Sequence, residues 1–359
     1  MRLPLVLLAV SLAAQPRAVS DDEVRSVHRS ALLIDTHNDV TSRTVAGFDI
    51  GKSAPDGHTD LPRLRAGGLG AQFFAVYVAG SFVEGNRSAR RAMEMIDTVR
   101  HDIVARYPRD FALARSAADI TRIRASGRIA ALMGIEGGHA IEDSLRLLRS
   151  FHALGVRYMT LTHANSNTWA DSSGDLEGRT KGLTPLGREV VREMNRLGMM
   201  VDISHVSDKT FWDALETSSA PLLASHSSCR ALAPVPRNMT DEMIVALARK
   251  GGVIQVNLGC QFLAPRPPGG GRAHATLADV VAHIDHIVKI AGIDAVGIGA
   301  DYDGVGCVPE GLEDVSKMPQ LTRALLEKGY SAKQIRKIYG ENTLRLMRAV
   351  EKAATSTPK

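Results

Sequence analysis

Six short apolar stretches of the sequence end in a histidine or a carboxylate residue, and these residue types bind metal ions in proteins. The candidate residues are His37, Asp39, Glu136, His163, His205, His226 and Asp301. One such histidine by itself is more often a hydrogen-bonded structural residue. A group of this many titratable side chains around one opening needs a shared positive charge, so together they predict a metal centre.

The donor types favour Zn²⁺ or a similar borderline ion. His37 and Asp39 are two residues apart on an expected strand, so their side chains face the same side and can bind one ion. One tetrahedral catalytic zinc ion that keeps an open position cannot bind all of these candidate ligands. Two ions that share one bridging carboxylate can bind them. Such a pair would lower the pKa of a bridging water and supply hydroxide near neutral pH. The pattern therefore predicts a metal-dependent hydrolase.

The apolar stretches alternate with longer segments of helical period, which is typical of parallel strands joined by crossover helices. The expected strands are 31–35, 72–78, 129–135, 158–162, 199–203, 221–224, 252–257 and 295–299. The expected helices are 88–107, 141–154, 184–197, 207–216, 240–249 and 276–291, with two more within 321–353. Strands that are apolar throughout predict an α/β fold of the (β/α)₈ TIM-barrel type, whose reactive groups lie at the C-terminal ends of the strands. An open doubly wound sheet is the alternative, because periodicity does not show closure.

Other polar residues are expected to lie outside the metal centre. His139 follows two glycines and is expected in a loop beside the centre, while Asp202 either orients a ligand or caps a turn. His283 and His286 are three residues apart in an expected helix, which favours a solvated helix face.

Two long segments lack a clear element. Segment 40–70, which contains His58 and Asp60, is expected to form an ordered excursion over the barrel rim. Segment 264–271 is rich in Pro and Gly and is expected to be an exposed, mobile loop.

The overall composition excludes several function classes. The 359 residues carry 44 Lys and Arg against 39 Asp and Glu, a formal net charge of +5 that is too mild and too dispersed for a nucleic-acid partner. The sequence has no Gly-x-Ser-x-Gly elbow, no Walker loop and no His-Glu-x-x-His helix. These absences argue against serine-esterase, nucleotide-binding and thermolysin-like chemistry.

The N-terminus has the pattern of a targeting segment. Arg2 precedes an apolar run over 3–14, so residues 1–20 are predicted to be a signal peptide, with a short buried helix as the alternative. Residues 21–359 would then form a single catalytic barrel domain with its last helices packed outside. No other stretch approaches about 18 apolar residues, so we expect no membrane span and an exported protein, periplasmic or secreted. The three cysteines allow one bridge at most, and buried inert thiols are the favoured interpretation.

The ordered motifs resemble those of the membrane dipeptidase (renal dipeptidase) family of zinc peptidases, and the likeness runs from about residue 30 to 342. The matching segments include 35–39 (DTHND), 61–64 (LPRL), 135–139 (IEGGH), 161–163 (LTH), 202–207 (DISHVS), 225–228 (SHSS), 236–238 (PRN) and 297–304 (GIGADYDG). The resemblance implies a (β/α)₈ barrel with two zinc ions that hydrolyses small dipeptides, commonly with a D-residue at the C-terminal position. A soluble, exported bacterial relative is the expected variant, and a homodimer is a candidate assembly.

The resemblance also implies residue roles. One zinc would be held by His37, Asp39 and Glu136, and the other by Glu136, His205 and His226, with Glu136 as the bridge. His163 would polarise the substrate carbonyl, Arg237 would bind the substrate's free carboxylate, and Asp301 would carry the proton from the bridging water to the leaving amine. The role of Arg237 comes from the resemblance alone. Animal members carry an aromatic residue shortly after the first metal motif, whereas Val40-Thr41-Ser42-Arg43 follows here, which changes the pocket for the N-terminal residue of the substrate.

Two alternatives remain open. Another barrel amidohydrolase acting on a non-dipeptide amide would usually show a His-x-His pair on its first strand and a bridging modified lysine, whereas this sequence has His37, Asp39 and Glu136. A non-catalytic export protein that binds metal or dipeptide would be expected to lack at least one ligand or the proton carrier, and every one of them is present.

Overall fold

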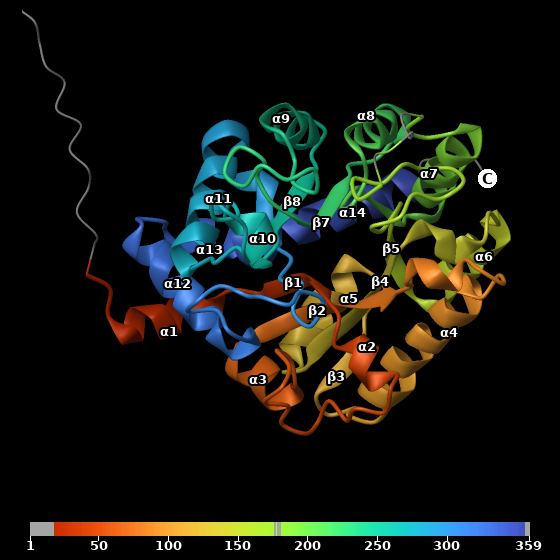
Figure 1. Cartoon of the computed structure of the whole chain (residues 1–359). Coiled ribbons are helices and arrows are strands. Elements are labelled where there is room, and N and C mark those ends of the chain that lie inside the picture. The colour runs from red at the N-terminus through yellow and green to blue at the C-terminus, as the bar shows by residue number, and fades with distance from the viewer. Residues whose placement is uncertain (1–17, 176, 178–180, 356–359) are drawn as a thin grey trace, which may run out of the picture.

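The computed structural model describes residues 18–175, 177 and 181–355, so most of the predicted signal peptide lies outside the described residues. Its centre is a parallel sheet whose strands are β1 (Leu33–Asn38), β2 (Leu69–Tyr77), β3 (Phe111–Leu113), β4 (Ile129–Glu136), β5 (Val156–Thr160), β6 (Met200–Asp202), β7 (Leu223–Ser227), β8 (Val253–Val256) and β9 (Val296–Ile298). In Figure 1 the strands lie in the middle of the molecule and helices surround them.

The sheet closes on itself, so the fold is the predicted eight-stranded (β/α)₈ TIM barrel and the open sheet is excluded. β1 pairs with β2 on one side and with β9 on the other, and β2 pairs along its length with β4. β4, β5, β6, β7, β8 and β9 then follow in order around the wall. The expected strands each match one of the eight wall strands, with shifts at their ends.

The short strand β3 was not predicted from the sequence. Its three residues pair with residues 129–131 of β4, on the edge where β5 pairs with residues 133–136. A run of three residues carries no period by which a strand could be recognised.

Helices cover the outside of the barrel. They are α1 (Asp21–Ser30), α4 (Ser88–Thr98), α5 (Ala117–Ala125), α6 (Leu145–Leu154), α7 (Pro185–Leu197), α8 (Asp208–Thr217), α9 (Asp241–Arg249), α11 (Leu277–Ala291), α12 (Met318–Glu327), α13 (Ala332–Arg336) and α14 (Asn342–Thr355). Two π-helical stretches, Val99–Ala105 and Lys337–Glu341, continue α4 and precede α14. Thr184 and Thr240 cap α7 and α9 by accepting from the backbone N–H of Gly187 and Met243.

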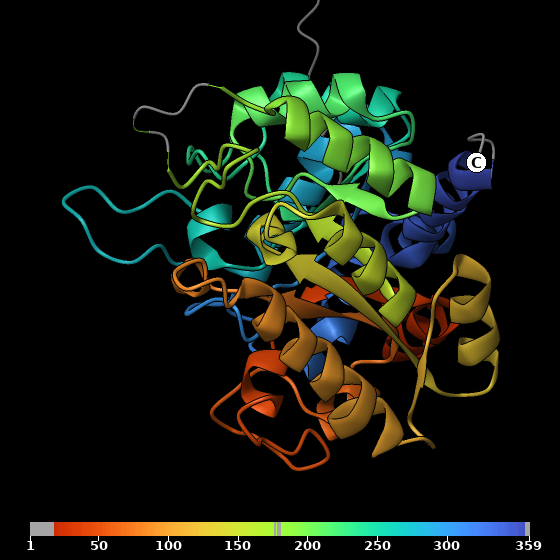
Figure 2. The same ribbon diagram turned by 90° about the vertical axis from the view of Figure 1, so that its right-hand side faces the viewer.

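The connecting segments at the barrel mouth contain short elements. The excursion 40–70 contains α2 (Thr41–Thr44) and α3 (Leu61–Ala66), and Asp60 caps α3 by accepting from Arg63 N. After β8 the chain forms α10 (Cys260–Leu263), and the following segment, 264–276, projects from the body in teal in Figure 2. These mouth segments provide the walls of the site.

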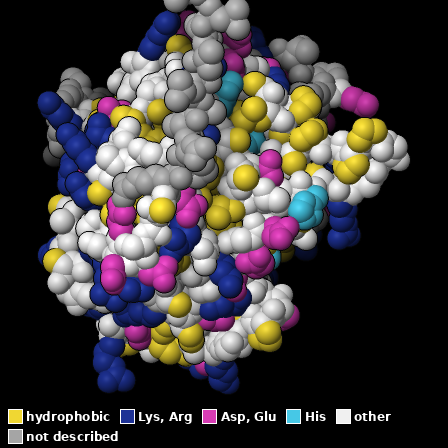
Figure 3. Space-filling model, turned by 90° about the vertical axis from the view of Figure 1, so that its left-hand side faces the viewer, with side chains coloured by type: hydrophobic (Ala, Val, Ile, Leu, Met, Phe, Trp, Pro, Cys, Tyr) yellow, Lys and Arg dark blue, Asp and Glu magenta, His cyan; other side chains and the backbone are white. Residues whose placement is uncertain are grey.

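Among the described residues, no helix is both long enough and apolar enough to cross a bilayer. On the face shown in Figure 3, acidic side chains lie among the basic ones, in keeping with the dispersed charge of the sequence.

Candidate metal centre and active site

Glu136, the last residue of β4, is a buried carboxylate whose two oxygens face two different sets of donors. Its Oε2 lies 3.5 Å from His37 Nε2, and that nitrogen is 3.1 Å from Asp39 Oδ2. Its Oε1 lies 2.9 Å from His205 Nε2 and 3.3 Å from His226 Nε2. The ends of β1, β4 and β7 and the turn after β6 thus bring five of the candidate residues into one cluster.

The cluster fits metal ions better than it fits internal hydrogen bonding. His37 Nε2 and Asp39 Oδ2 are both buried and have no hydrogen-bond partner, although they lie side by side. Burial, followed by the charges of His37 and Arg237, holds the pKa of His226 well below its ordinary value, so its ring is neutral and can offer a lone pair. Burial alone would raise the pKa of Glu136, but the charges of His37 and His163 keep it well below its ordinary value. A divalent cation would satisfy these imidazole and carboxylate donors together.

Asp301 follows β9 and completes the same opening. Its Oδ2 accepts from Asn257 Nδ2 at 2.7 Å, and its carboxylate groups with His37 and His226 within ligand distance. Its backbone φ is +61°, a left-handed conformation that turns the chain sharply at this point. Burial, aided by the charges of Asp39 and Glu136, raises the pKa of Asp301 to about 8. A group in this environment can hold a proton near neutral pH.

A cavity of about 310 Å³ opens above the cluster. Its lining residues include Asp39, Ser42, Tyr77, Glu136, His163, His205, Gln261, Phe262, Asp301 and Val305. His163 is partly exposed at the cavity wall, with Nε2 3.9 Å from Glu136 Oε1 and its ring edge-on to Tyr77 at 4.8 Å. His163 can therefore reach a bound molecule while lying beside the donor set.

Arg237 lies next to His226, in the segment after β7. Its Nη1 donates to Ser227 Oγ at 2.8 Å, its Nη2 donates to the carbonyl of His226 at 2.6 Å, and its guanidinium lies over the Phe262 ring at 5.6 Å. Burial lowers the pKa of Arg237 to about 10, which leaves it charged at neutral pH. Nothing local in the sequence distinguishes this arginine from a surface residue.

His58, His139 and His286 are not among the donor groups of the cluster. His139 Nε2 donates to the carbonyl of Val78 at 2.9 Å, and the backbone N–H of His58 donates to Asp303 Oδ1 at 2.8 Å. His286 contacts Asp241 at 2.7 Å on the outside of α11. The solvated-face interpretation is wrong for His283, which is fully buried. The helix turns only about 60° between these two positions, but α10 and the segment after β7 cover the His283 side.

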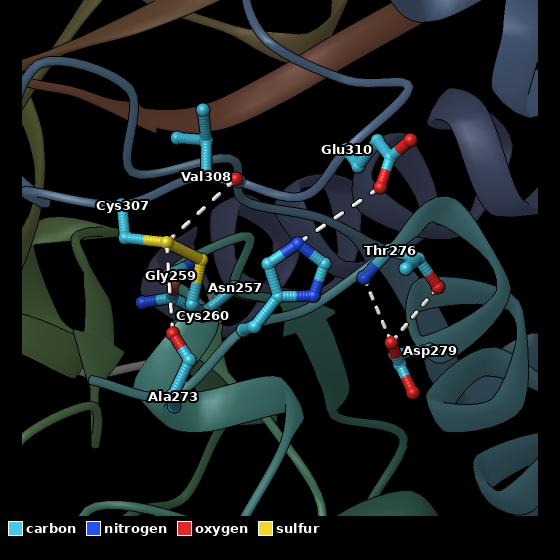
Figure 4. The surroundings of a disulfide bond; sticks show 10 residues. Asn257, Gly259, Cys260, Ala273, Thr276, Asp279, Cys307, Val308 and Glu310 are labelled. Atoms are coloured by element: carbon cyan, nitrogen blue, oxygen red, sulfur yellow. Dashed lines mark hydrogen bonds and ion pairs between the residues drawn. A yellow bond between two sulfur atoms is a disulfide. The ribbon is translucent and has the colours of Figure 1, made fainter. Parts of the chain in front are cut away.

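The prediction of buried thiols is wrong for two of the three cysteines. Cys260 and Cys307 form a disulfide with their Cα atoms 5.5 Å apart, and Cys229 alone is a free, buried thiol. Figure 4 shows the bridge beside Asn257 and Gly259. The disulfide joins α10, which carries Gln261 and Phe262, to the segment after Asp301, so it ties together two walls of the cavity. The 46 intervening residues conceal this pairing in the sequence.

A closed barrel with histidines and carboxylates at its strand ends defines a metal-dependent hydrolase of the amidohydrolase type. Comparison with known proteins narrows this class: the sequence pattern of the membrane dipeptidase family, peptidase family M19, matches residues 21–359. The chain belongs to that family and is a metallo-dipeptidase.

Relatives of known sequence agree with this assignment. The chain is 41% identical to "Dipeptidase tcpJ" of Claviceps purpurea over 307 residues, which cover 84% of this chain and 71% of the relative. It is 37% identical to "Uncharacterized dipeptidase C965.12" of Schizosaccharomyces pombe over 366 residues, which cover 96% of this chain and 86% of the relative. These relatives are fungal, so the expectation of a bacterial source is not supported.

Solved structures show the same fold. The probable dipeptidase PvdM from Pseudomonas aeruginosa has a TM-score of 0.85 at 27% identity, over 93% of this chain and 98% of that one. A metallo peptidase from Rhodobacter sphaeroides was solved with a phosphinate mimic of the dipeptide L-Ala-D-Ala. It has a TM-score of 0.80 at 30% identity, over 89% of this chain and 99% of that one.

Proposed function

We propose that this chain is a binuclear zinc dipeptidase that hydrolyses small dipeptides, including L,D-dipeptides. The arrangement of Glu136 carries the proposal, because its two oxygens each face a separate donor set. His37 and Asp39 would hold one ion with Glu136, and His205 and His226 would hold the other. Bound zinc would supply the Lewis acidity that makes water nucleophilic near neutral pH.

The chain's own residues then account for binding and proton transfer. His163, at the cavity wall, would donate to the carbonyl oxygen of the scissile bond and stabilise the negative charge that develops there. Asp301 would take a proton from the attacking water and pass it to the leaving amine nitrogen. Arg237 keeps N–H groups beyond the two that bind Ser227 and His226, and these would hold the substrate's free carboxylate.

Two observations support dipeptides as the substrate class. The cavity of about 310 Å³ is at the lower end of the range of about 300–1,000 Å³ that is usual for small-molecule sites. The ligand bound to the Rhodobacter sphaeroides relative mimics L-Ala-D-Ala, which favours L,D-dipeptides among the substrates. Ser42 also lines this cavity, and its short side chain would leave room there for the N-terminal residue of a bound dipeptide.

We also propose that the protein is exported, periplasmic or secreted, after removal of a signal peptide over residues 1–20. The Cys260–Cys307 disulfide supports this location, since disulfides form and persist in oxidising compartments. A homodimer remains a candidate assembly, which sedimentation of the purified mature chain would test.

The deciding experiment measures cleavage of L-Ala-L-Ala, L-Ala-D-Ala and C-terminally amidated L-Ala-D-Ala, with metal content determined on the same sample. We expect about two zinc ions per chain, cleavage of the free dipeptides that a chelator abolishes and zinc restores, and poor cleavage of the amide. Two metals without cleavage of any dipeptide would overturn the substrate assignment in favour of another amide. Cleavage that survives complete metal removal would overturn the metal-dependent reaction itself.

A further inference from the structure

The ring of His37 is held from below the cavity by the hydroxyl of Tyr158 on β5. Tyr158 Oη lies 2.8 Å from His37 Nδ1 and donates to the carbonyl of Thr36 at 3.0 Å. The carbonyl can only accept, so it takes the single hydroxyl hydrogen of Tyr158. The tyrosine oxygen must then accept from His37 Nδ1–H, so Nε2, the nitrogen that faces Asp39 and Glu136, is the one that would offer a lone pair to a metal ion.

The barrel interior is shaped around this tyrosine. Tyr158 is fully buried, and a Cβ at Gly134 would lie 1.9 Å from Tyr158 Cζ. Only glycine at position 134 leaves space for the ring, which also packs against Phe73 with 5.4 Å between ring centroids. The hydroxyl is thus fixed beneath His37 by the packing of three strands.

A separate chain of hydrogen bonds fixes His226. Its Nδ1 lies 2.7 Å from Ser225 Oγ, and that hydroxyl donates to Asp202 Oδ2 at 2.6 Å. A serine hydroxyl has one hydrogen and the carboxylate can only accept, so Ser225 Oγ accepts from His226 Nδ1–H. The lone pair of His226 is therefore on Nε2, which faces Glu136.

Asp202 is itself held rigidly at the end of β6. Its Oδ1 accepts from the backbone N–H of Ser225 at 2.8 Å and of Ser204 at 3.1 Å. Its Oδ2 also accepts from the hydroxyl of Thr160 on β5. Both Asp202 and Ser225 are fully buried, so this network has no competing contact with solvent.

We propose that Tyr158 and the Ser225–Asp202 pair are positioning residues, each serving one half of the metal centre. Tyr158 orients His37 for the ion bound with Asp39, whereas Ser225 and Asp202 orient His226 for the ion bound with His205. The inference rests on the binuclear centre proposed above. A hydrogen bond to the far nitrogen of a ligating histidine fixes its tautomer and ring angle, and its loss typically costs about 10- to 100-fold in metal affinity.

The test is zinc affinity of the full chain, measured by competition with a chromophoric chelator. Tyr158→Phe and Ser225→Ala should each weaken one of the two ions about 10- to 100-fold and leave the other unchanged. Tyr339→Phe is the matched control, because it removes another buried tyrosine hydroxyl that contacts Thr322 at 2.7 Å, away from the cluster. The control should bind both ions as the unmodified protein does.

An Asp39→Ala background shows which ion each network serves. Asp39→Ala is expected to remove the first ion, so adding Tyr158→Phe should change the affinity for the remaining ion little, whereas adding Ser225→Ala should weaken it. Equal effects of both changes in this background would overturn the division of roles. If Tyr158→Phe and Tyr339→Phe lowered zinc affinity equally, the loss would come from disturbed packing, and the positioning role of Tyr158 would be refuted.

The outcome is independent of the proposed reaction. The readout uses no dipeptide, so failure to cleave dipeptides leaves this inference intact. Should the unmodified protein bind fewer than two zinc ions, both the binuclear proposal and this inference fall. Two ions bound with unchanged affinity in Tyr158→Phe and Ser225→Ala would overturn the inference alone.

Discussion

His283 should make the stability of the fold depend on pH. This side chain of α11 is fully buried, its Nδ1 accepts from the backbone N–H of Cys229 at 3.0 Å, and its Nε2 donates to the carbonyl of Leu263 at 3.0 Å. The neutral ring satisfies both contacts. Burial lowers the pKa of His283 from 6.5 to about 4, because the charged ring would lose its contact with water. Protonation would also place a second N–H of the ring against the Cys229 N–H.

The sign and size of the effect follow from that shift. Between these two values the unfolded chain binds the proton more tightly than the folded one, so the free energy of unfolding falls as the pH falls. The contribution of His283 is fully present above pH 6.5, and a pKa of about 4 in the folded state makes the total loss about 3 kcal/mol on going below both values. At about pH 5 roughly 2 kcal/mol of this should be lost.

Urea unfolding at about pH 7.5 and about pH 5 measures this loss. The drop in unfolding free energy between the two pH values should be smaller by about 2 kcal/mol in His283→Asn than in the unmodified protein. His274→Asn removes an exposed histidine and serves as the control, with an unchanged drop expected. Contributions from the metal centre are common to all three proteins and cancel in the comparison. An equal drop in His283→Asn and the unmodified protein would refute the assignment of the pH effect to His283.

Three further changes test the site. Asp301→Asn should keep the metal but lower kcat about 10²- to 10⁴-fold, because it removes proton transfer alone; loss of zinc from this variant would contradict its role. Arg237→Ala should raise KM roughly ten- to a hundred-fold for dipeptides with a free carboxylate, whereas an equal effect on amidated substrates would contradict carboxylate binding. Cys260→Ser with Cys307→Ser should cost about 4 kcal/mol of stability, since the bridge spans 47 positions, and should raise KM because both cavity walls lose their link; an unchanged KM would show that the bridge only stabilises the fold.

The barrel could be predicted because each of its strands has a local pattern in the sequence. Each wall strand is a short apolar run between helical segments, and the proposed ligands lie at the ends of those strands, as with His37 near the end of β1 and Glu136 at the end of β4. Parallel strands bring their C-terminal ends to one mouth, so residues far apart in sequence converge without further information.

The remaining features depend on tertiary contacts that no local pattern records. The disulfide requires two mouth segments to meet, and the place of Arg237 depends on a loop that returns to the carbonyl of His226. The burial of His283 depends on α10, a helix of four residues that covers one side of α11. These contacts form only in the folded chain, so no stretch of the sequence indicates them.

The proposed metal centre draws on residues at two heights of the barrel. The proposed ligands occupy the strand ends, whereas Tyr158 lies two residues before the end of β5 and shares its face with Thr160, because side chains alternate along a strand. Tyr158 reaches His37 across the barrel interior, and Thr160 reaches Asp202. Strand β5 thus contributes to both orienting networks but supplies none of the proposed ligands. Conservative changes along this strand should therefore alter metal affinity while leaving the residues that line the cavity in place, which separates metal binding from substrate selection in this fold.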